Sequence, residues 1–426
     1  MQTKQNYNSF IKMQMTYLIH KVNLLRDVPR SALRTSIQRV CVILSSSRSG
    51  SSLLTSLLAK HPNIASLAGE IEPFLILTSN GFGHNSESDA IDALSNPSAL
   101  ADNIFDDLMV PSQDLPSLSS LKKKWERRLL LQFPALFSEK TEHERLIESL
   151  DAVLTAANVR LLQSEGELQA AVLSEVFRDD PWRKGYYDGN AHSGAMCFYN
   201  EPLKIEEPPF VVPRHYGRQF QSNDVKKSIV LFKAPADAYR IGMYKQLFPN
   251  ANIRYIHLTR GYAQAVNGLL DGWLSPRGFF SHDLSRLGIS LDIKGYSNVV
   301  EFGKQWWKFD LPPNWKEFTD TSLEEVCLNQ WLSTHRSILA SGVKTLRIAF
   351  EGFLSEPARV INHITNYLGL QEMALPAVLP ATMVTEAPKR RRWKKREGQL
   401  LAMGKKWEVR GMMASLGYEM DPETWL

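Results

Sequence analysis

The stretch Arg39-Val-Cys-Val-Ile-Leu-Ser-Ser-Ser-Arg-Ser-Gly-Ser-Ser-Leu-Leu-Thr-Ser-Leu-Leu58 decides the fold class. Its first part, Arg39–Leu44, is short, apolar and rich in β-branched residues, which is typical of a buried strand. The polar turn that follows contains Gly50 and cannot comfortably continue a strand. In the last part, leucines recur at the spacing of one helical face. The stretch therefore predicts a strand, a glycine-containing turn and a helix, in that order.

This order is the usual setting of a phosphate-binding loop, in which backbone N–H groups and the helix N-terminus point at an anion. The loop that binds ATP has the pattern G-x-x-x-x-G-K-[ST]. Aligned to it, Ser45 takes the first glycine, Gly50 the second, Ser51 the lysine and Ser52 the final hydroxyl residue. In ATP enzymes that lysine reaches the β- and γ-phosphates, and the next hydroxyl holds Mg²⁺. Without the lysine, the loop favours a compact tetrahedral dianion held by Arg48, hydroxyls and backbone donors, with no metal.

Three later runs resemble the first strand, namely Ser228–Phe232, Ile253–Leu258 and Thr345–Phe350. Helical patterns lie between them. Apolar strands separated by helices predict a parallel sheet that is covered on both faces. We therefore expect an α/β protein with a three-layer P-loop NTPase-like fold, in which helices flank a central parallel sheet and a large helical insertion is present.

The remaining segments depart from this alternation. Residues 1–38 predict an N-terminal helical arm, and residues 39–426 the main domain. Within that domain, residues 80–225 and 273–318 interrupt the pattern and contain many aromatic residues. We expect them to be insertions over the carboxyl edge of the sheet, where α/β proteins bind ligands. Aromatic walls there would favour an apolar or aromatic ligand.

Composition and charge narrow the class of protein. The chain has 426 residues, of which 43% are hydrophobic and 22% charged, as in ordinary globular proteins. Its net charge is +5, and the excess of basic residues is confined to one run. Lys389–Arg396 contains seven basic residues, and the rest of the chain has 43 basic against 45 acidic ones. We therefore expect no nucleic-acid partner, since such proteins usually carry a basic face over a whole domain.

The cysteines and the N-terminal region indicate the compartment. Cys41, Cys197 and Cys327 show neither a disulfide framework nor zinc spacing, which favours a reducing environment. No segment has the pattern of a membrane-spanning helix or a secretory signal. We expect a cytoplasmic protein without a membrane partner.

Four motifs then follow one another in a recognisable order. Ser46–Leu54, with His61-Pro62 and Gly69-Glu70 after it, matches a P-R-S-G-[ST]-[ST]-L-L loop, an H-P pair and a glutamate, except that Ser47 replaces the proline. The later motifs are Leu231–Pro235, Leu247–Arg260, and Phe350–Pro357 with Asn366–Gly369. Together the four motifs resemble those of the sulfotransferases that use 3′-phosphoadenosine-5′-phosphosulfate (PAPS), in the branch that includes bacterial and tyrosylprotein enzymes.

The resemblance implies a role for each matched residue. Lys233, at a strand end, would stabilise the leaving phosphate, and Arg260 would hold the 3′-phosphate. Glu70 would be the catalytic base, with Glu72 as a competing candidate. The residues that would bind the 5′-phosphosulfate are Ser47, Arg48, Ser49, Gly50, Ser51 and Ser52.

Two features near the 3′-phosphate leave alternatives open. The family usually has a serine eight residues after the strand-end arginine, but this chain has Gly268 there, preceded by Asn267. Either Asn267 donates in place of that serine or the partner comes from elsewhere. Arg392, Trp393 and Lys394 are similar to the late basic loop with which the family closes over the nucleotide. The other interpretation of that run is a solvated, charged helix.

The activity that the resemblance implies is in-line transfer of the PAPS sulfuryl group to a hydroxyl of a small-molecule, natural-product or carrier-bound acceptor. A carboxylate would act as the base, and no metal would be required. One alternative is a P-loop kinase that uses Mg·ATP on a small molecule. The other is a nucleic-acid-binding protein that uses Lys389–Arg396 and Lys122–Arg128, since each of these basic clusters contains a tryptophan that can stack on bases.

Overall fold

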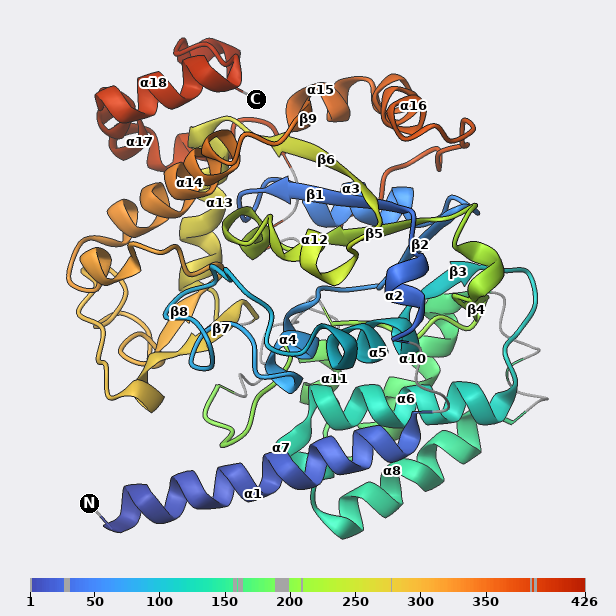
Figure 1. Cartoon of the computed structure of the whole chain (residues 1–426). Helices are drawn as coiled ribbons and strands as arrows, with labels where there is room; N and C mark the ends of the chain where they lie inside the picture. Colours follow the sequence, from blue (N-terminus) through green and yellow to red (C-terminus); the bar gives the residue numbers. More distant parts are fainter. Residues whose placement is uncertain are drawn as a thin grey trace.

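The computed structural model describes residues 2–26, 31–155, 159, 164–187, 199–207, 210–276, 278–383, 385–386 and 389–425. Within these residues, seven strands form one sheet in the order β4-β3-β2-β5-β1-β6-β9 (Figure 1). β2, β5, β1, β6 and β9 run parallel, and β3 and β4 add an antiparallel edge beside β2. The strands are β1 (Arg39–Ser45), β2 (Ile64–Ser66), β3 (Met109–Pro111), β4 (Gly217–Gln219), β5 (Ile229–Lys233), β6 (Asn252–Thr259) and β9 (Thr345–Ala349).

Helices cover both faces of this sheet. Cys41 and Ile43 of β1 belong to a buried cluster with the leucines of α3 (Ser51–Leu58) and the isoleucines of α16 (Pro357–Leu368). Val40 and Val42 point the other way, into a cluster shared with α5 (Pro97–Asp107) and α12 (Met243–Leu247). This alternation is the period of two of a strand that is buried on both faces. The predicted three-layer α/β fold class is confirmed.

The register of β1 fixes what stands at the carboxyl edge of the sheet. Ile43 pairs with Lys233, the last residue of β5, and Ser45 pairs with Leu258 near the end of β6. Arg260 follows β6 directly. Because the carboxyl ends of parallel strands meet at one edge, the loop after β1 lies between Lys233 and Arg260.

Residues 80–225 contribute a helical layer and the two antiparallel edge strands. Their helices surround a buried cluster that contains Trp125, and Leu18 and Val22 from the N-terminal helix join the same cluster. The region thus extends the sheet itself in addition to covering it. The helices of this layer are α1 (Gln2–Leu25), α6 (Leu118–Gln132), α7 (Pro134–Phe137), α8 (Lys140–Val153), α10 (Glu165–Val176) and α11 (Pro181–Tyr187).

Residues 273–318 form a two-stranded antiparallel sheet of β7 (Phe280–Asp283) and β8 (Trp306–Lys308). Most aromatic residues of this segment pack in a core cluster that includes Trp273, Trp307 and Trp315. That cluster also contains side chains from α13 (Tyr262–Leu274), α14 (Leu323–Ala340), α17 (Glu397–Gly404) and α18 (Trp407–Leu416). The shorter helices elsewhere are α2 (Leu33–Ser36), α4 (Glu72–Leu77) and α15 (Phe350–Ser355).

The strands predicted from the sequence are confirmed as β1, β5, β6 and β9, with differences at their ends. The sequence predicts a strand from Ser228, but β5 begins at Ile229. Phe350 was expected to end a strand, but it begins helix α15. β2, β3 and β4 were not predicted, because three residues are too few to show a period. None of the described helices is long and apolar enough to cross a membrane.

Gly50 is a position where the fold of the loop depends on the absence of a side chain. Its φ of +86° lies in the left-handed region, and a Cβ there would come within 2.1 Å of the Phe350 ring. We expect Gly50→Ala to lower the free energy of unfolding by about 1–3 kcal/mol, measured by denaturant titration. Gly352→Ala is the control, because a Cβ there meets no atom within 4 Å and the site is helical. Equal stability of the two variants would contradict this account of the loop.

Candidate functional site

A cavity of about 910 Å³ lies at the carboxyl edge of the sheet. Its size is near the upper end of the usual range for small-molecule sites, about 300–1,000 Å³, so it has room for two substrates. Its walls come from the loop after β1, the end of β5, helix α4, the 273–318 segment and late residues within 379–383 and 389–392. The predicted site residues that line it are Ser47, Arg48, Gly50, Ser51, Ser52, Glu70, Lys233, Arg260 and Arg392.

The loop after β1 offers a set of unused backbone donors. Arg48 and Gly50 both have positive φ angles, +65° and +86°. In the part of the chain that the structure describes, the backbone N–H groups from Arg48 to Ser52 donate no hydrogen bond. The Ser45 hydroxyl is buried without a partner, whereas Ser46 and Ser49 join their hydroxyls at 2.6 Å. Left-handed residues and free N–H groups at a helix start form a concave anion site.

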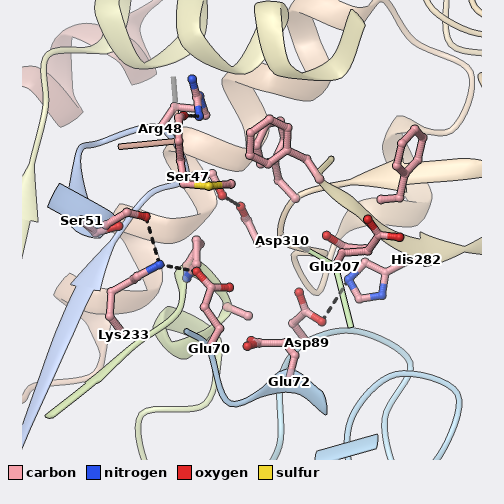
Figure 2. Close-up of a pocket in the computed structure, with 18 of the residues that line it drawn as sticks. Ser47, Arg48, Ser51, Glu70, Glu72, Asp89, Glu207, Lys233, His282 and Asp310 are labelled. Atoms are coloured by element: carbon pink, nitrogen blue, oxygen red, sulfur yellow. Dashed lines mark hydrogen bonds and ion pairs between the residues drawn. The ribbon is translucent and has the colours of Figure 1, made fainter. Parts of the chain in front are cut away.

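Lys233 connects this loop to Glu70 (Figure 2). Its Nζ donates to Ser52 Oγ at 3.3 Å and forms an ion pair with Glu70. Burial raises the pKa of Glu70 to about 7, while the Lys233 ammonium opposes the rise and the nearby Glu72 adds to it. A carboxyl group that titrates near neutral pH, next to an anion site, is suited to accept a proton.

Glu72 has a different partner. It forms an ion pair with Arg240, and Arg240 also contacts Asp237 at 3.0 Å. Both glutamates line the cavity, but the described contacts of Lys233 are with Glu70 and Ser52. The geometry therefore favours Glu70 over Glu72 as the group nearest the loop.

The Arg48 side chain lies elsewhere than the sequence led us to expect. It turns away from Ser51 and Lys233 (Figure 2), and its guanidinium donates to the Met383 carbonyl at 2.7 Å. Its Cβ lies where Gly268 leaves room, because a Cβ on Gly268 would be only 3.1 Å from it. The position where the resemblance implied a serine is thus covered by an arginine from the loop after β1.

Three arginines gather at this end of the cavity. Arg48, Arg260 and Arg392 all line it, and Arg260 Nη1 donates to the Arg48 carbonyl at 2.8 Å. Burial, together with the charges of Arg260 and Arg392, lowers the pKa of Arg48 to about 10. Burial also lowers the pKa of Arg260. The Glu351 carboxylate opposes this change, and the charge of Arg392 adds to it. Arg48 Nε is buried without a partner. Clustered, partly unsatisfied guanidinium groups fit an anion with several acceptor oxygens.

The remaining predicted residues near the 3′ end lie behind this cluster. Asn267 is buried and accepts a hydrogen bond from Arg396 at 2.6 Å. Trp393 packs in the core against Trp425, and Lys394 is exposed above the Trp393 ring. None of Asn267, Trp393 and Lys394 belongs to the cavity lining.

Much of the basic run pairs with an acid of its own chain. Arg392, Lys395 and Arg396 all contact Asp271 of α13, at 2.7–2.8 Å. The run forms a short 3-10 helix, Arg392–Arg396, and is continued by α17. Its beginning, Lys389 and Arg390, lines the cavity. The run therefore combines both interpretations, since one part borders the site and another part is exposed.

The other basic cluster, Lys122–Arg128, is largely internal. Lys124, Arg127 and Arg128 are buried, and Arg127 contacts Asp107 at 2.5 Å. Trp125 is buried in the cluster of helical side chains. These charges hold helices together and offer little surface to a nucleic acid.

The opposite end of the cavity contains groups that the sequence did not single out. Its walls include Phe82, Phe280 and Trp306. Its polar groups are paired: His282 Nε2 lies 3.2 Å from Asp89 Oδ1, and Lys204 donates to Glu207 at 2.5 Å. These residues come from four separate stretches of chain, 82–89, 204–207, 280–282 and 306, so no single local motif could have revealed the group as a whole.

Comparisons with known proteins give structural matches only. No protein-family model matches the chain, and no curated protein matches it. Solved structures that it resembles include a sulfotransferase domain from the curacin biosynthetic pathway (11% identity, 90% of this chain and 99% of that one, TM-score 0.37). A second is the sulfotransferase domain of the Synechococcus PCC 7002 olefin synthase (12% identity, 89% of this chain and 94% of that one, TM-score 0.33). A third is a Mycobacterium avium sulfotransferase (11% identity, 94% of this chain and 80% of that one, TM-score 0.32). With TM-scores below 0.5, these matches carry no argument about activity, which has to rest on the site.

The position of Arg48 allows a test of the nucleotide site that the sequence motifs imply. We expect Arg48→Met to weaken binding of 3′,5′-adenosine bisphosphate about tenfold or more, and that of 5′-AMP much less, because the guanidinium lies with Arg260 and not over the loop. Isothermal titration calorimetry with the two nucleotides measures the ratio. Arg286→Met is the control, since Arg286 lines the far end and is paired with Asp283. An equal loss for both nucleotides would place Arg48 on the 5′-phosphate instead.

Proposed function

We propose that this protein is a PAPS-dependent sulfotransferase that acts on a hydroxyl of a small-molecule or natural-product acceptor. The observation that carries the proposal is the contact of Lys233 with both Ser52 of the loop and Glu70. An anion site, a cation at its mouth and a carboxyl group able to take a proton thereby meet at one point. The transfer of a sulfuryl group from a phosphosulfate to a hydroxyl requires these three elements.

Two separate anion sites support PAPS over ATP as the donor. The unused N–H groups from Arg48 to Ser52 would hold the 5′-phosphosulfate, together with the hydroxyls of Ser51 and Ser52. Arg260, Arg48 and Arg392 would hold the 3′-phosphate. A nucleotide with charges at both the 5′ and 3′ positions matches this arrangement, whereas ATP carries its charge on one side of the ribose.

The donor supplies an activated sulfuryl group, and the chain supplies position, charge and a proton acceptor. Glu70 would take the acceptor hydroxyl proton on its carboxylate. Lys233 would donate from Nζ to the oxygen that gains charge as the phosphate leaves, and the loop N–H groups would share that charge. We propose that no metal takes part in the reaction.

The far end of the cavity would bind the acceptor. Aromatic walls with paired polar groups favour a ligand that is largely apolar and carries few charges. A small molecule or a carrier-bound chain would both fit this description. The burial of Lys124, Arg127 and Arg128, and the pairing of the late basic run with Asp271, weigh against a nucleic acid as the partner.

Ligand-induced stabilisation tests the donor. We expect 3′,5′-adenosine bisphosphate without Mg²⁺ to raise the melting temperature, because a ligand at 100 times its Kd stabilises the folded state by about 2.7 kcal/mol. Mg·ATP at the same concentration should give a smaller shift. Differential scanning fluorimetry measures both. A larger response to Mg·ATP would support the kinase alternative and overturn the proposal.

The base is tested by the pH dependence of transfer. Glu70 accepts a proton only as a carboxylate, and its pKa is raised to about 7, so we expect kcat/KM to increase with pH through about 7 and to level off roughly one pH unit above it. Glu70→Gln should lower kcat by about 10²–10⁴-fold and leave binding of 3′,5′-adenosine bisphosphate intact. Release of 3′,5′-adenosine bisphosphate from PAPS measures turnover, with phenol as the acceptor because its hydroxyl, like that of tyrosine, ionises only near about pH 10. If Glu72→Gln abolishes turnover and Glu70→Gln does not, the base is Glu72.

A further inference from the structure

The donor loop is held from outside by the segment that follows β8. Ser47 Oγ donates to Asp310 Oδ1 at 2.6 Å, and both residues are buried. Tyr239 Oη donates to the other oxygen, Asp310 Oδ2, at 2.8 Å. One carboxylate thus receives two hydroxyl groups from two different parts of the site.

These two parts carry the proposed donor machinery. Ser47 belongs to the anion-binding loop, and Tyr239 ends the short 3-10 helix Pro235–Tyr239. That helix begins two residues after Lys233, the last residue of β5. Asp310 therefore spans the gap between the loop and the strand end that presents Lys233.

Asp310 itself is fixed by the core behind it. Its backbone carbonyl accepts from Gln330 Nε2 at 2.7 Å and from Trp307 Nε1 at 3.0 Å. Trp273 Nε1 in turn donates to Gln330 Oε1 at 2.8 Å. Because Asp310 is anchored in this way, a change in its side chain would move the loop and not the anchor.

A second contact joins the same segment to the next loop residue. The Phe279 ring stacks on the Phe309 ring, with centroids 4.7 Å apart, and lies 5.1 Å from the Arg48 guanidinium carbon. Both phenylalanines have positive φ angles, +64° and +62°, which bulky residues rarely adopt. Gly272 leaves the space for Phe309, since a Cβ there would lie 2.2 Å from its ring. Such strained residues tend to occur where the surrounding structure holds a functional group in place.

The charge of Asp310 is not needed to hold the fold together. In the described part of the chain, no lysine or arginine forms an ion pair with Asp310. The charged group that acts on it is Asp89, which itself pairs with His282. The hydroxyl groups that donate to its carboxylate are those of Ser47 and Tyr239. Burial raises the pKa of Asp310 to about 6. A buried carboxylate without a cation is costly, and an amide would fill the same space at lower cost.

We propose that Asp310 is a positioning residue for the donor loop, which acts through Ser47 and Tyr239 to set the distance between the loop and Lys233. The inference rests on the proposed function, since the loop is taken to bind the donor. It gives the 273–318 segment a role in donor binding as well as in lining the acceptor end of the cavity.

A double-mutant cycle on donor-product binding tests this role. We expect Ser47→Ala and Asp310→Ala each to weaken binding of 3′,5′-adenosine bisphosphate about tenfold, because each change removes the hydrogen bond that holds the loop and leaves its partner buried and unsatisfied. The double variant should bind the nucleotide about tenfold more weakly than the parent protein, and not a hundredfold, because both changes remove the same interaction. Asp310→Asn should restore affinity to within about twofold of the parent protein, because its amide oxygen can still accept from Ser47. Calorimetry at a temperature well below the melting point of every variant measures these affinities.

Asp224→Ala is the matched control for stability. Asp224 is also buried, and it holds Arg218 at 2.8 Å and the Gln221 backbone N–H at 2.8 Å, outside the cavity lining. This variant should lower the melting temperature without changing affinity for the nucleotide. Additive losses in the cycle, or an Asp310→Asn variant as weak as Asp310→Ala, would overturn the positioning role. If the unmodified protein fails to bind 3′,5′-adenosine bisphosphate, the proposed function itself fails, which is a separate outcome.

Discussion

The parallel pairing of β1 with β5 on one side and β6 on the other is the constraint on which the site depends. The partner of Ile43 is Lys233, and the partner of Ser45 is Leu258, two residues before Arg260. A slip of one residue in either ladder would turn the next side chain to the opposite face of the sheet. The buried, alternating side chains of β1 prevent such a slip, because each face of the strand packs against its own set of helices.

The distribution of buried charge separates the two ends of the cavity. At the acceptor end, the described acids and bases are matched, as with Glu72 and Arg240 or Asp89 and His282. At the loop end, Arg48 and Arg260 are half-buried, and the charges of Arg260 and Arg392 lower the pKa of Arg48. An anionic ligand would relieve this repulsion, since guanidinium groups form their strongest bonds with anionic oxygens. The unbalanced positive charge that an anionic ligand would neutralise thus lies at one end of the cavity.

Glycines and strained residues allow the donor end to form. Gly268 makes room for Arg48, and Gly272 makes room for Phe309. Ser47, the position at which the loop departs from the sulfotransferase pattern, is the one tied to Asp310. The departures from the expected pattern therefore occur together, around a loop whose side chains take partners from the 273–318 segment.

The sequence by itself determined the fold class and the position of the glycine-containing loop between β1 and α3. The strand–turn–helix order at Arg39–Leu58 and the strands that end near Lys233 and Arg260 are local patterns, and local patterns are set by neighbouring residues in the chain. It also pointed to Glu70, through the motif that contains it. Only the tertiary structure decided that Lys233 contacts Glu70 while Glu72 is bound by Arg240, that the Arg48 side chain lies against Gly268, and that Trp393 packs in the core. Asp310, Tyr239 and Phe279 were out of reach for the same reason. Asp310 meets Ser47 and Phe279 meets Arg48 across more than 200 positions of chain, and Tyr239 joins them through Asp310. Contacts between residues so far apart depend on how the helices and strands pack and not on any pattern within one of them.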